Sequence, residues 1–383
     1  MVFLFLGSVI AGSISVANLA LAQPVGCPSG PIGSNQTITC SSASSSGSPQ
    51  TSSVAITVSG NSDNNNNVTV TEYTTIQLSG SPIGLAGGNT VSNSGTLNSN
   101  SFTNGYGMSA GANGRSQAGG NTFTNTSTGS IVTAGGNAAG IYISATNSTS
   151  AANTINNAGS ITTSGANAAG IRLNSGSKTG INSISNSGTI RTSGTSANGI
   201  DILGTAQVTI ENTGTIASTG ANSFGIYSAG NITTLNNFQG GSTPLTYSGV
   251  LPANYNVIVA NTAAYGKLDA SGGNVTGVMN FGIKSGSTLE FNTTYSTVLS
   301  GIKVNNLGTS YGSFTAGGIT YQWALAHRIN GSSDQTDLVI LPAPVAPTLP
   351  AIEAALQAES YLIAPIYYDT RTAVVEMGNT LQG

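Results

Sequence analysis

One serine in a motif-like context and the single histidine are the first residues of this sequence to consider for hydrolytic chemistry. Ser109 lies in Gly107–Gly111, which reads Gly-Met-Ser-Ala-Gly and matches the G-x-S-x-G pattern of a nucleophilic elbow. In a chain with 52 glycines such a match arises by chance, and here it lies inside a repeat. The single histidine, His327, stands beside Arg328, and we interpret it as an exposed turn residue rather than a general base. No catalytic triad is therefore predicted.

Charged side chains are too sparse to predict a metal centre or a glycan-cleaving site. Asp63 is the one acidic residue of the Asn-rich stretch 61–67, which lacks calcium-ligand spacing. Arg172, Arg191 and Asp201 stand apart in the sequence, whereas pectin-cleaving β-helices cluster such groups on one face. We predict no catalytic residue, no metal ligand and no cofactor. A polysaccharide lyase or hydrolase is the alternative, which a cluster of carboxylates on one face would favour.

The composition excludes several classes of partner. Only 5% of the 383 residues are charged and the net charge is −3, against roughly 25% charged residues in an ordinary soluble domain. The chain therefore lacks the basic surface that nucleic acids or anionic lipids require. Hydrophobic residues still make up 38% and are regularly placed, which favours an ordered chain over low-complexity disorder.

This regular placement comes from a repeat of Asn-x-Gly-(Ser/Thr)-Ile, then Thr/Ser-x-Gly, then Gly-Ile. In the better copies the first glycine precedes the second by 6 residues and the third by 11, while the spacing between copies shrinks from 30 to 29 to 26. Each copy contains three apolar steps. The clearest set is Leu97, Ile131, Ile161, Ile190 and Ile216. The length of a copy therefore varies only in the segment after Gly-Ile, and the rest of the copy has constant spacing.

The apolar steps predict short strands rather than helices. The third step, which follows the last glycine, usually has an apolar i+2 partner (Ile143, Leu173, Ile202), and β-branched residues favour strands. Three strands per copy would close one coil of a right-handed single-stranded parallel β-helix, with isoleucines stacked from coil to coil. We expect the repeat asparagines to form side-chain ladders. We also expect glycine to supply positive φ at the corners, and Ser and Thr to cover the outer faces.

After Asn237 the repeat fades and aromatic residues increase, which predicts an atypical C-terminal cap. Three runs stand out: Asn254–Val259 (Asn-Tyr-Asn-Val-Ile-Val), Tyr265–Leu268 (Tyr-Gly-Lys-Leu) and Tyr295–Gly301 (Tyr-Ser-Thr-Val-Leu-Ser-Gly). Together with the Asn-Ser-Gly-Thr-Ile repeats, they resemble the passenger of a type V autotransporter over about residues 85–341.

The resemblance implies an exported protein whose C-terminal passenger block folds first and templates the remaining coils. It also implies outer-membrane translocation machinery as a partner. The translocator barrel of that family has no counterpart within these 383 residues, and truncation, a frameshifted reading or a barrel supplied elsewhere would each account for this.

The sequence predicts six segments. Residues 1–22 are a signal peptide, because the apolar run Val2–Leu21 ends in Ala-Leu-Ala and so places the mature start at Gln23; a transmembrane anchor is the alternative. Residues 23–53 are a Ser/Gly-rich cap, in which export favours a Cys27–Cys40 disulfide over two free thiols. The others are the β-helix repeats (54–240), the C-terminal cap (241–341), a Pro-rich linker (342–350) and a helical tail (351–383).

These features together predict an exported passenger at the bacterial cell surface or outer membrane, or secreted from it. Its uncharged Ser/Thr/Asn faces would present hydrogen-bonding groups to a host or matrix surface, or to like molecules. We expect a structural or adhesive role without catalysis.

Overall fold

The computed structural model describes residues 27, 31–41, 50–52, 56–58, 65–78, 80–111, 119–145, 151–175, 180–205, 207–330 and 333–342. The chain divides into two compact units, 1–341 and 342–383, and the fold below is that of the first. The predicted signal peptide, the mature start at Gln23, Asp63 and the helical tail all lie outside the described residues. Among the described residues, no helix has the length and hydropathy needed to span a bilayer.

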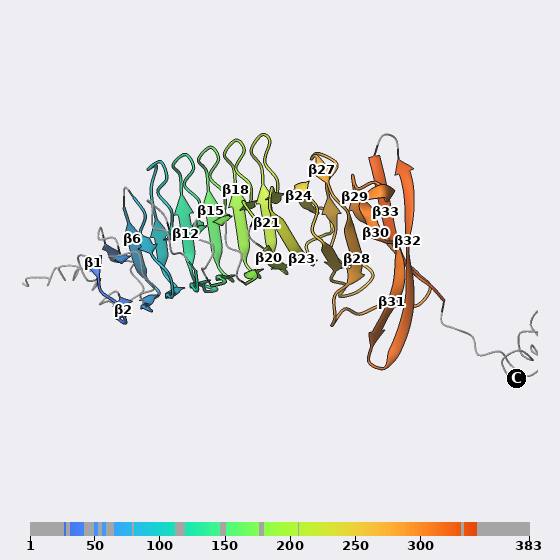
Figure 1. Cartoon of the computed structure of the whole chain (residues 1–383), viewed down its shortest axis with the longest axis horizontal. Coiled ribbons are helices and arrows are strands. Elements are labelled where there is room, and N and C mark those ends of the chain that lie inside the picture. Colours follow the sequence, from blue (N-terminus) through green and yellow to red (C-terminus); the bar gives the residue numbers. More distant parts are fainter. Residues whose placement is uncertain are drawn as a thin grey trace, which may run out of the picture. The chain divides into compact units, whose positions relative to one another are not determined.

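The strands form three long sheets, and successive coils as far as β21 add one strand to each sheet (Figure 1). Sheet A contains β1 (Pro31–Ile32), β4 (Ile56–Val58), β7 (Ile83–Leu85), β10 (Met108–Ala110), β13 (Ile141–Ala145), β16 (Ile171–Ser175), β19 (Ile200–Leu203), β22 (Ile226–Ser228), β24 (Leu245–Val250), β26 (Leu268–Asp269), β29 (Thr293–Ser300), β33 (Ser333–Ile340), β32 (Ile319–Asn330) and β31 (Tyr311–Ala316), with β27 (Val275–Thr276) beside β24.

Sheet B contains β2 (Thr37–Cys40), β5 (Asn67–Val70), β8 (Thr90–Asn93), β11 (Thr122–Asn125), β14 (Thr154–Asn157), β17 (Asn182–Asn186), β20 (Gln207–Asn212), β23 (Asn231–Asn237), β25 (Asn254–Val257), β28 (Met279–Ile283) and β30 (Leu307–Thr309), which the 3-10 turn η2 (Val304–Asn306) precedes. Sheet C contains β3 (Gln50–Ser52), β6 (Thr74–Gln77), β9 (Thr96–Asn98), β12 (Ser130–Thr133), β15 (Ser160–Thr163), β18 (Thr189–Thr192) and β21 (Thr215–Ser218). Pairing between coils is parallel, so the predicted parallel β-helix is confirmed.

Stacked isoleucines fill the interior, as predicted. Ile131, Ile161, Ile190 and Ile216 are register partners in sheet C, and each is at most 2% exposed. Residues beside them in the strands point outward, which gives the alternating burial of strands such as β11 and β12. Removing this apolar surface from water is the main favourable term for each coil.

A buried asparagine ladder runs along the end of the sheet B strands, also as predicted. The Nδ2 groups of Asn93, Asn125, Asn157 and Asn186 each donate to the Oδ1 of the next asparagine at 2.8 Å, and Asn212 continues the ladder to Asn237 at 3.1 Å. Sequence reasoning missed a second ladder, formed by Asn66, Asn89, Asn121, Asn153 and Asn182. In it, each Oδ1 from Asn89 onward accepts the backbone N–H of the preceding member at 2.9–3.1 Å.

Glycine supplies positive φ at some corners, as expected, for example at Gly111 and Gly204, but the glycines of the repeat motif do not. No positive φ is found at Gly135, Gly165, Gly194 or Gly220, and the left-handed corner lies two residues later, at Asn137, Asn167, Ser196 and Asn222. The glycines are required because the coils approach closely there. A Cβ on Gly165 would lie 1.9 Å from the carbonyl oxygen of Gly135 in the preceding coil.

The coils change character in the C-terminal part, as predicted for a cap. Within 207–330, sheet C ends at β21, and the side chain of Gln239 replaces the next strand: its Oε1 accepts the N–H of Ile216 at 2.7 Å and its Nε2 donates to the Ile216 carbonyl at 3.0 Å. Sheet A then turns antiparallel through β29, β33, β32 and β31. Buried rings fill this part: Tyr247, Tyr255, Tyr265, Phe281, Tyr295 and Trp323.

Candidate functional site

Ser109, the serine of the G-x-S-x-G match, is held inside sheet A. It lies on β10, is 1% exposed, and its hydroxyl donates to the carbonyl of Ile83 at 3.2 Å. A nucleophilic elbow instead presents its serine at a sharp strand-to-helix turn. In this position the hydroxyl ties β10 to β7.

His327 does not lie in a turn, which corrects the sequence interpretation. It lies in β32, where its Nε2 is 3.1 Å from Oδ1 of Asp334 and its Nδ1 is 3.2 Å from the hydroxyl of Thr336, both on β33. A carboxylate, an imidazole and a hydroxyl in this sequence of contacts are also found in a hydrolase triad. Thr336 is 0% exposed, however, so its hydroxyl cannot contact a substrate. The arrangement therefore serves to join two antiparallel strands of the cap.

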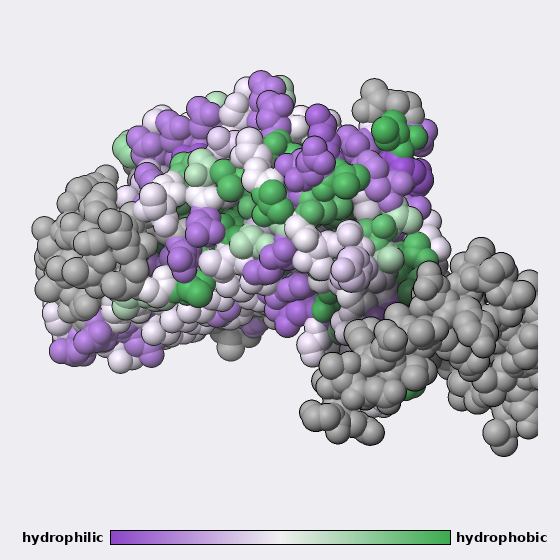
Figure 2. Space-filling model, turned by 45° about the vertical axis from the view of Figure 1, so that its right-hand side comes forward, coloured by the Kyte–Doolittle hydropathy of each residue, from purple (hydrophilic) through white to green (hydrophobic). Residues whose placement is uncertain are grey.

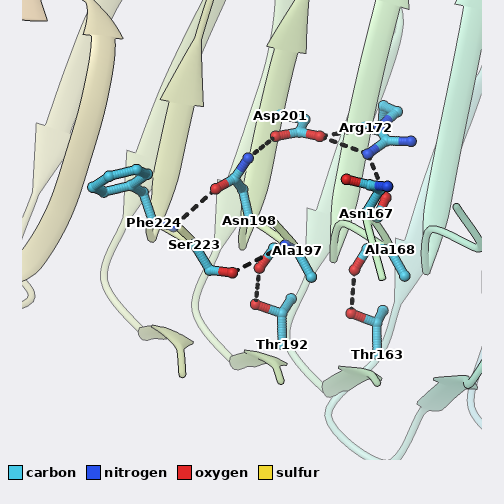
Figure 3. Close-up of polar contacts among 10 residues, drawn as sticks. All are labelled: Thr163, Asn167, Ala168, Arg172, Thr192, Ala197, Asn198, Asp201, Ser223 and Phe224. Atoms are coloured by element: carbon cyan, nitrogen blue, oxygen red, sulfur yellow. Dashed lines mark hydrogen bonds and ion pairs between the residues drawn. The ribbon is translucent and has the colours of Figure 1, made fainter. Parts of the chain in front are cut away.

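Arg172 and Asp201 are not isolated, although they are 29 residues apart in the chain. They are register partners on the outer side of β16 and β19, and Nε and Nη2 of Arg172 donate to Oδ2 of Asp201 at 3.0 and 2.8 Å. The other carboxylate oxygen accepts from Nδ2 of Asn198 at 2.6 Å, and Oδ1 of Asn198 accepts the N–H of Phe224 at 2.8 Å (Figure 3). One network thus links three neighbouring coils. Arg191 lies apart from it, exposed on β18 in sheet C.

Hydrogen bonds from threonine hydroxyls hold the turns that carry this network. Thr163 and Thr192 donate through their hydroxyls to the carbonyls of Ala168 and Ala197, each at 2.5 Å (Figure 3). Ser223 accepts the N–H of Ala197 at 3.0 Å, which joins one turn to the next. The polar side chains therefore project from a rigid part of the fold.

Aromatic side chains lie at both ends of the network. Tyr142 precedes Arg172 in the outward column of sheet A, and Tyr227 follows Asp201. The ring of Tyr106 stacks on that of Tyr142, with centroids 4.3 Å apart. Burial and the neighbouring Tyr142 raise the pKa of Tyr106, and Arg172 opposes this rise. Phe224 lies on the turn before β22. We call this set the sheet A strip: Tyr106, Tyr142, Arg172, Asp201, Asn198, Phe224 and Tyr227.

A shallow hollow of about 340 Å³ lies where sheet C ends. Thr213, Thr215, Phe238, Gln239 and Tyr265 are among its lining residues, and Nζ of Lys267 lies 5.1 Å from the Tyr265 ring centroid. Both ends of the Gln239 amide are occupied by backbone groups. The polar atoms there thus close the edge of β21.

The remaining predicted site residues are the cysteines. A disulfide joins Cys27 to Cys40, the last residue of β2, whose side chain is buried at the N-terminal end of the core. Among the described residues, no three His, Cys, Asp or Glu side chains gather as metal ligands would. No protein-family model, no curated protein and no solved structure matches the chain.

Proposed function

We propose that the chain is the exported, non-catalytic passenger portion of a bacterial cell-surface protein, and that it acts as a structural or adhesive β-helix. The observation that carries the proposal is the chemistry of the outward columns. Sheet C presents Ser130, Ser160, Thr189 and Thr215 in register, and sheet B presents Thr122, Thr154, Ser183 and Thr209. Ladders of uncharged hydroxyls offer many weak hydrogen bonds over a long surface, which suits attachment better than catalysis.

The surface composition supports the same reading. Figure 2 shows that much of the drawn face has intermediate hydropathy, with apolar residues gathered near its middle. Several charged groups are already engaged within the chain, as in the pairs Arg172–Asp201 and Arg328–Asp337. Asp201, Asp334 and Asp337 are held by Arg172, His327 and Arg328, respectively, and Glu211 lies on another sheet. The described carboxylates therefore support the polysaccharide-cleaving alternative poorly.

Bead attachment and digestion of intact cells by external protease test the proposal. Beads coated with the purified full chain should attach to matrix-coated surfaces or to one another. A quadruple variant of the sheet C column (Ser130→Ala, Ser160→Ala, Thr189→Val, Thr215→Val) should reduce the number of attached beads several-fold, while its circular dichroism spectrum stays the same as that of the wild type. In the producing cells, external protease should digest the chain. Release of reducing ends from polysaccharides by the pure protein, or protection from external protease, would overturn the proposal.

A further inference from the structure

The sheet A strip combines two aromatic ends with a polar middle. Tyr142, Arg172, Asp201 and Tyr227 occupy successive coils of one outward column. At about 4.8 Å per strand, the two tyrosines lie roughly 14 Å apart. Tyr106 supports the first end by stacking on one face of the Tyr142 ring. The strip therefore offers two ring platforms separated by a network of planar polar groups.

The polar middle carries no uncompensated charge. The Arg172 guanidinium is held by Asp201 at 2.8 Å, and these side chains are 14% and 5% exposed. Asn198 completes the network, and a second outward column adds Ser144 and Asn174 next to it. A polyanion would find no free cation here, because the guanidinium already faces a carboxylate.

The edges of the strip exclude another class of ligand. Strands β13, β16, β19 and β22 each have a partner strand on both sides, so their backbone groups cannot accept an added peptide strand. What the strip and the column beside it present is side-chain chemistry: tyrosine rings and hydroxyls, the exposed Asn174 amide and a paired guanidinium. Rings that pack against C–H surfaces, alternating with planar hydrogen-bonding groups, match a molecule with apolar faces and hydroxyl edges.

We infer that the sheet A strip binds a short neutral oligosaccharide of pyranose units, with sugar rings stacked at Tyr142 and Tyr227 and hydroxyls bonded between them. The inference rests on the adhesive function proposed above and names its ligand class. Binding is favoured because hydrogen bonds from Thr163 and Thr192 hold the turns of the strip in place. Little conformational entropy is therefore lost when the ligand binds.

The test uses the full chain and a panel of neutral tri- to hexasaccharides built from glucose, galactose, mannose and N-acetylhexosamines. The best binder is then titrated by calorimetry against variants. Tyr142→Ala and Tyr227→Ala should each lower the affinity about tenfold, which corresponds to the loss of one ring contact. Tyr142→Phe should keep it, because the ring remains. Tyr311→Ala is the control, since Tyr311 is 76% exposed on β31, outside the strip.

Two results would overturn the inference: no binding to any oligosaccharide of the panel, or unchanged affinity in a Tyr142→Ala, Tyr227→Ala variant whose thermal melt matches wild type. Beads distinguish this failure from failure of the proposed function. If beads coated with that double variant attach as well as wild type, the strip is not the adhesive site although adhesion stands. If wild-type beads never attach while the strip binds sugar, the adhesive role fails and the sugar site stands.

Discussion

At the scale of single residues, two residue types set how closely successive coils approach. Isoleucine fills the interior, and glycine clears the backbone at the turn. The glycine requirement is steric, since Gly165 would place a Cβ 1.9 Å from the Gly135 oxygen, whereas a Cβ on Gly136 would find its nearest neighbour at 3.9 Å. Glycines at consecutive positions of the repeat, such as Gly135 and Gly136, therefore have different roles, because a Cβ on Gly135 would lie 2.0 Å from the Phe102 carbonyl oxygen.

Gly165→Ala should destabilise the chain by about 3 kcal/mol, because the added methyl group forces two coils apart. Gly136→Ala is the matched control and should change the free energy of unfolding by less than about 0.5 kcal/mol. Denaturant melts followed by circular dichroism measure both. Equal stability of the two variants would contradict the close-approach role.

Ile190→Asp should be among the most damaging single changes. Ile190 is 0% exposed between Ile161 and Ile216, so the carboxylate would be buried without a partner, at a cost of about 4 kcal/mol or more. Thr162→Asp, which introduces the same group at an exposed position of β15 opposite Arg191, should be nearly neutral. A denaturant melt of Ile190→Asp that overlays wild type would refute the assigned ladder.

At the scale of elements, the two ends of the β-helix differ. At the N-terminal end, the Cys27–Cys40 disulfide packs against the core, whereas at the C-terminal end the antiparallel strands β31–β33 follow the last parallel coils. The antiparallel strands cover a core and strand edges that a solenoid would otherwise expose.

The disulfide gives a prediction for the N-terminal element. The mature protein should begin at Gln23 and carry a Cys27–Cys40 bond worth about 3 kcal/mol in the chain-entropy model. Intact mass before and after reduction, with alkylation, checks both statements. Two alkylatable thiols in the untreated protein would exclude the bond, and a mass that retains residues 1–22 would exclude the cleavage.

The buried tyrosines make the C-terminal element sensitive to alkali. Burial raises the pKa of Tyr247 and of Tyr255 far above the ordinary value. In the unfolded chain they would ionise near pH ~10, while in the folded chain they keep their protons. Their contribution to stability is thus complete below that pH. It falls as the pH rises further, by about 1.4 kcal/mol per pH unit for each tyrosine.

Denaturant melts at about pH 8 and about pH 11, followed by Trp323 fluorescence, test this dependence. Tyr255→Phe should flatten the alkaline loss because it removes one of the ionising groups. The exposed Tyr311→Phe should leave it unchanged. A loss of the same size in wild type and Tyr255→Phe would show that other groups cause it.

At the scale of the whole molecule, stability is a sum over coils and their neighbours, so parts of the stack can melt separately. The coils from β11 to β21 bury mainly isoleucine, alanine and asparagine. The C-terminal block, about Tyr247 to Ile340, buries large rings in contact with one another, such as Phe281 and Trp323 at 5.5 Å. Larger buried area per residue favours the second part.

Limited proteolysis in intermediate denaturant should therefore leave a C-terminal core that contains Trp323. The templating role implied by the autotransporter resemblance needs the same order of stability. Mass spectrometry of the resistant fragment identifies it. Loss of the Trp323 region before the coils between Asn157 and Ile226 would contradict both the ranking and the folding role.

The sequence alone determined the period, the strands and the stacked ladders. Copies of one repeat place equal residues above one another, so that Ile161 above Ile190 and Asn157 above Asn186 follow from spacing. It did not determine how the glycines act. A close backbone approach and a positive φ both call for glycine, and only the geometry of the turn distinguishes Gly165 from the left-handed corner at Asn167.

Tertiary structure decided the contacts between unlike residues. The pairs Arg172–Asp201 and His327–Asp334, and Gln239 at the edge of β21, have no repeated pattern that would reveal them. Each depends on the register between strands and on the length of the coil that separates them, and this length varies from copy to copy. The sheet A strip exists because that register places side chains from several coils in one column.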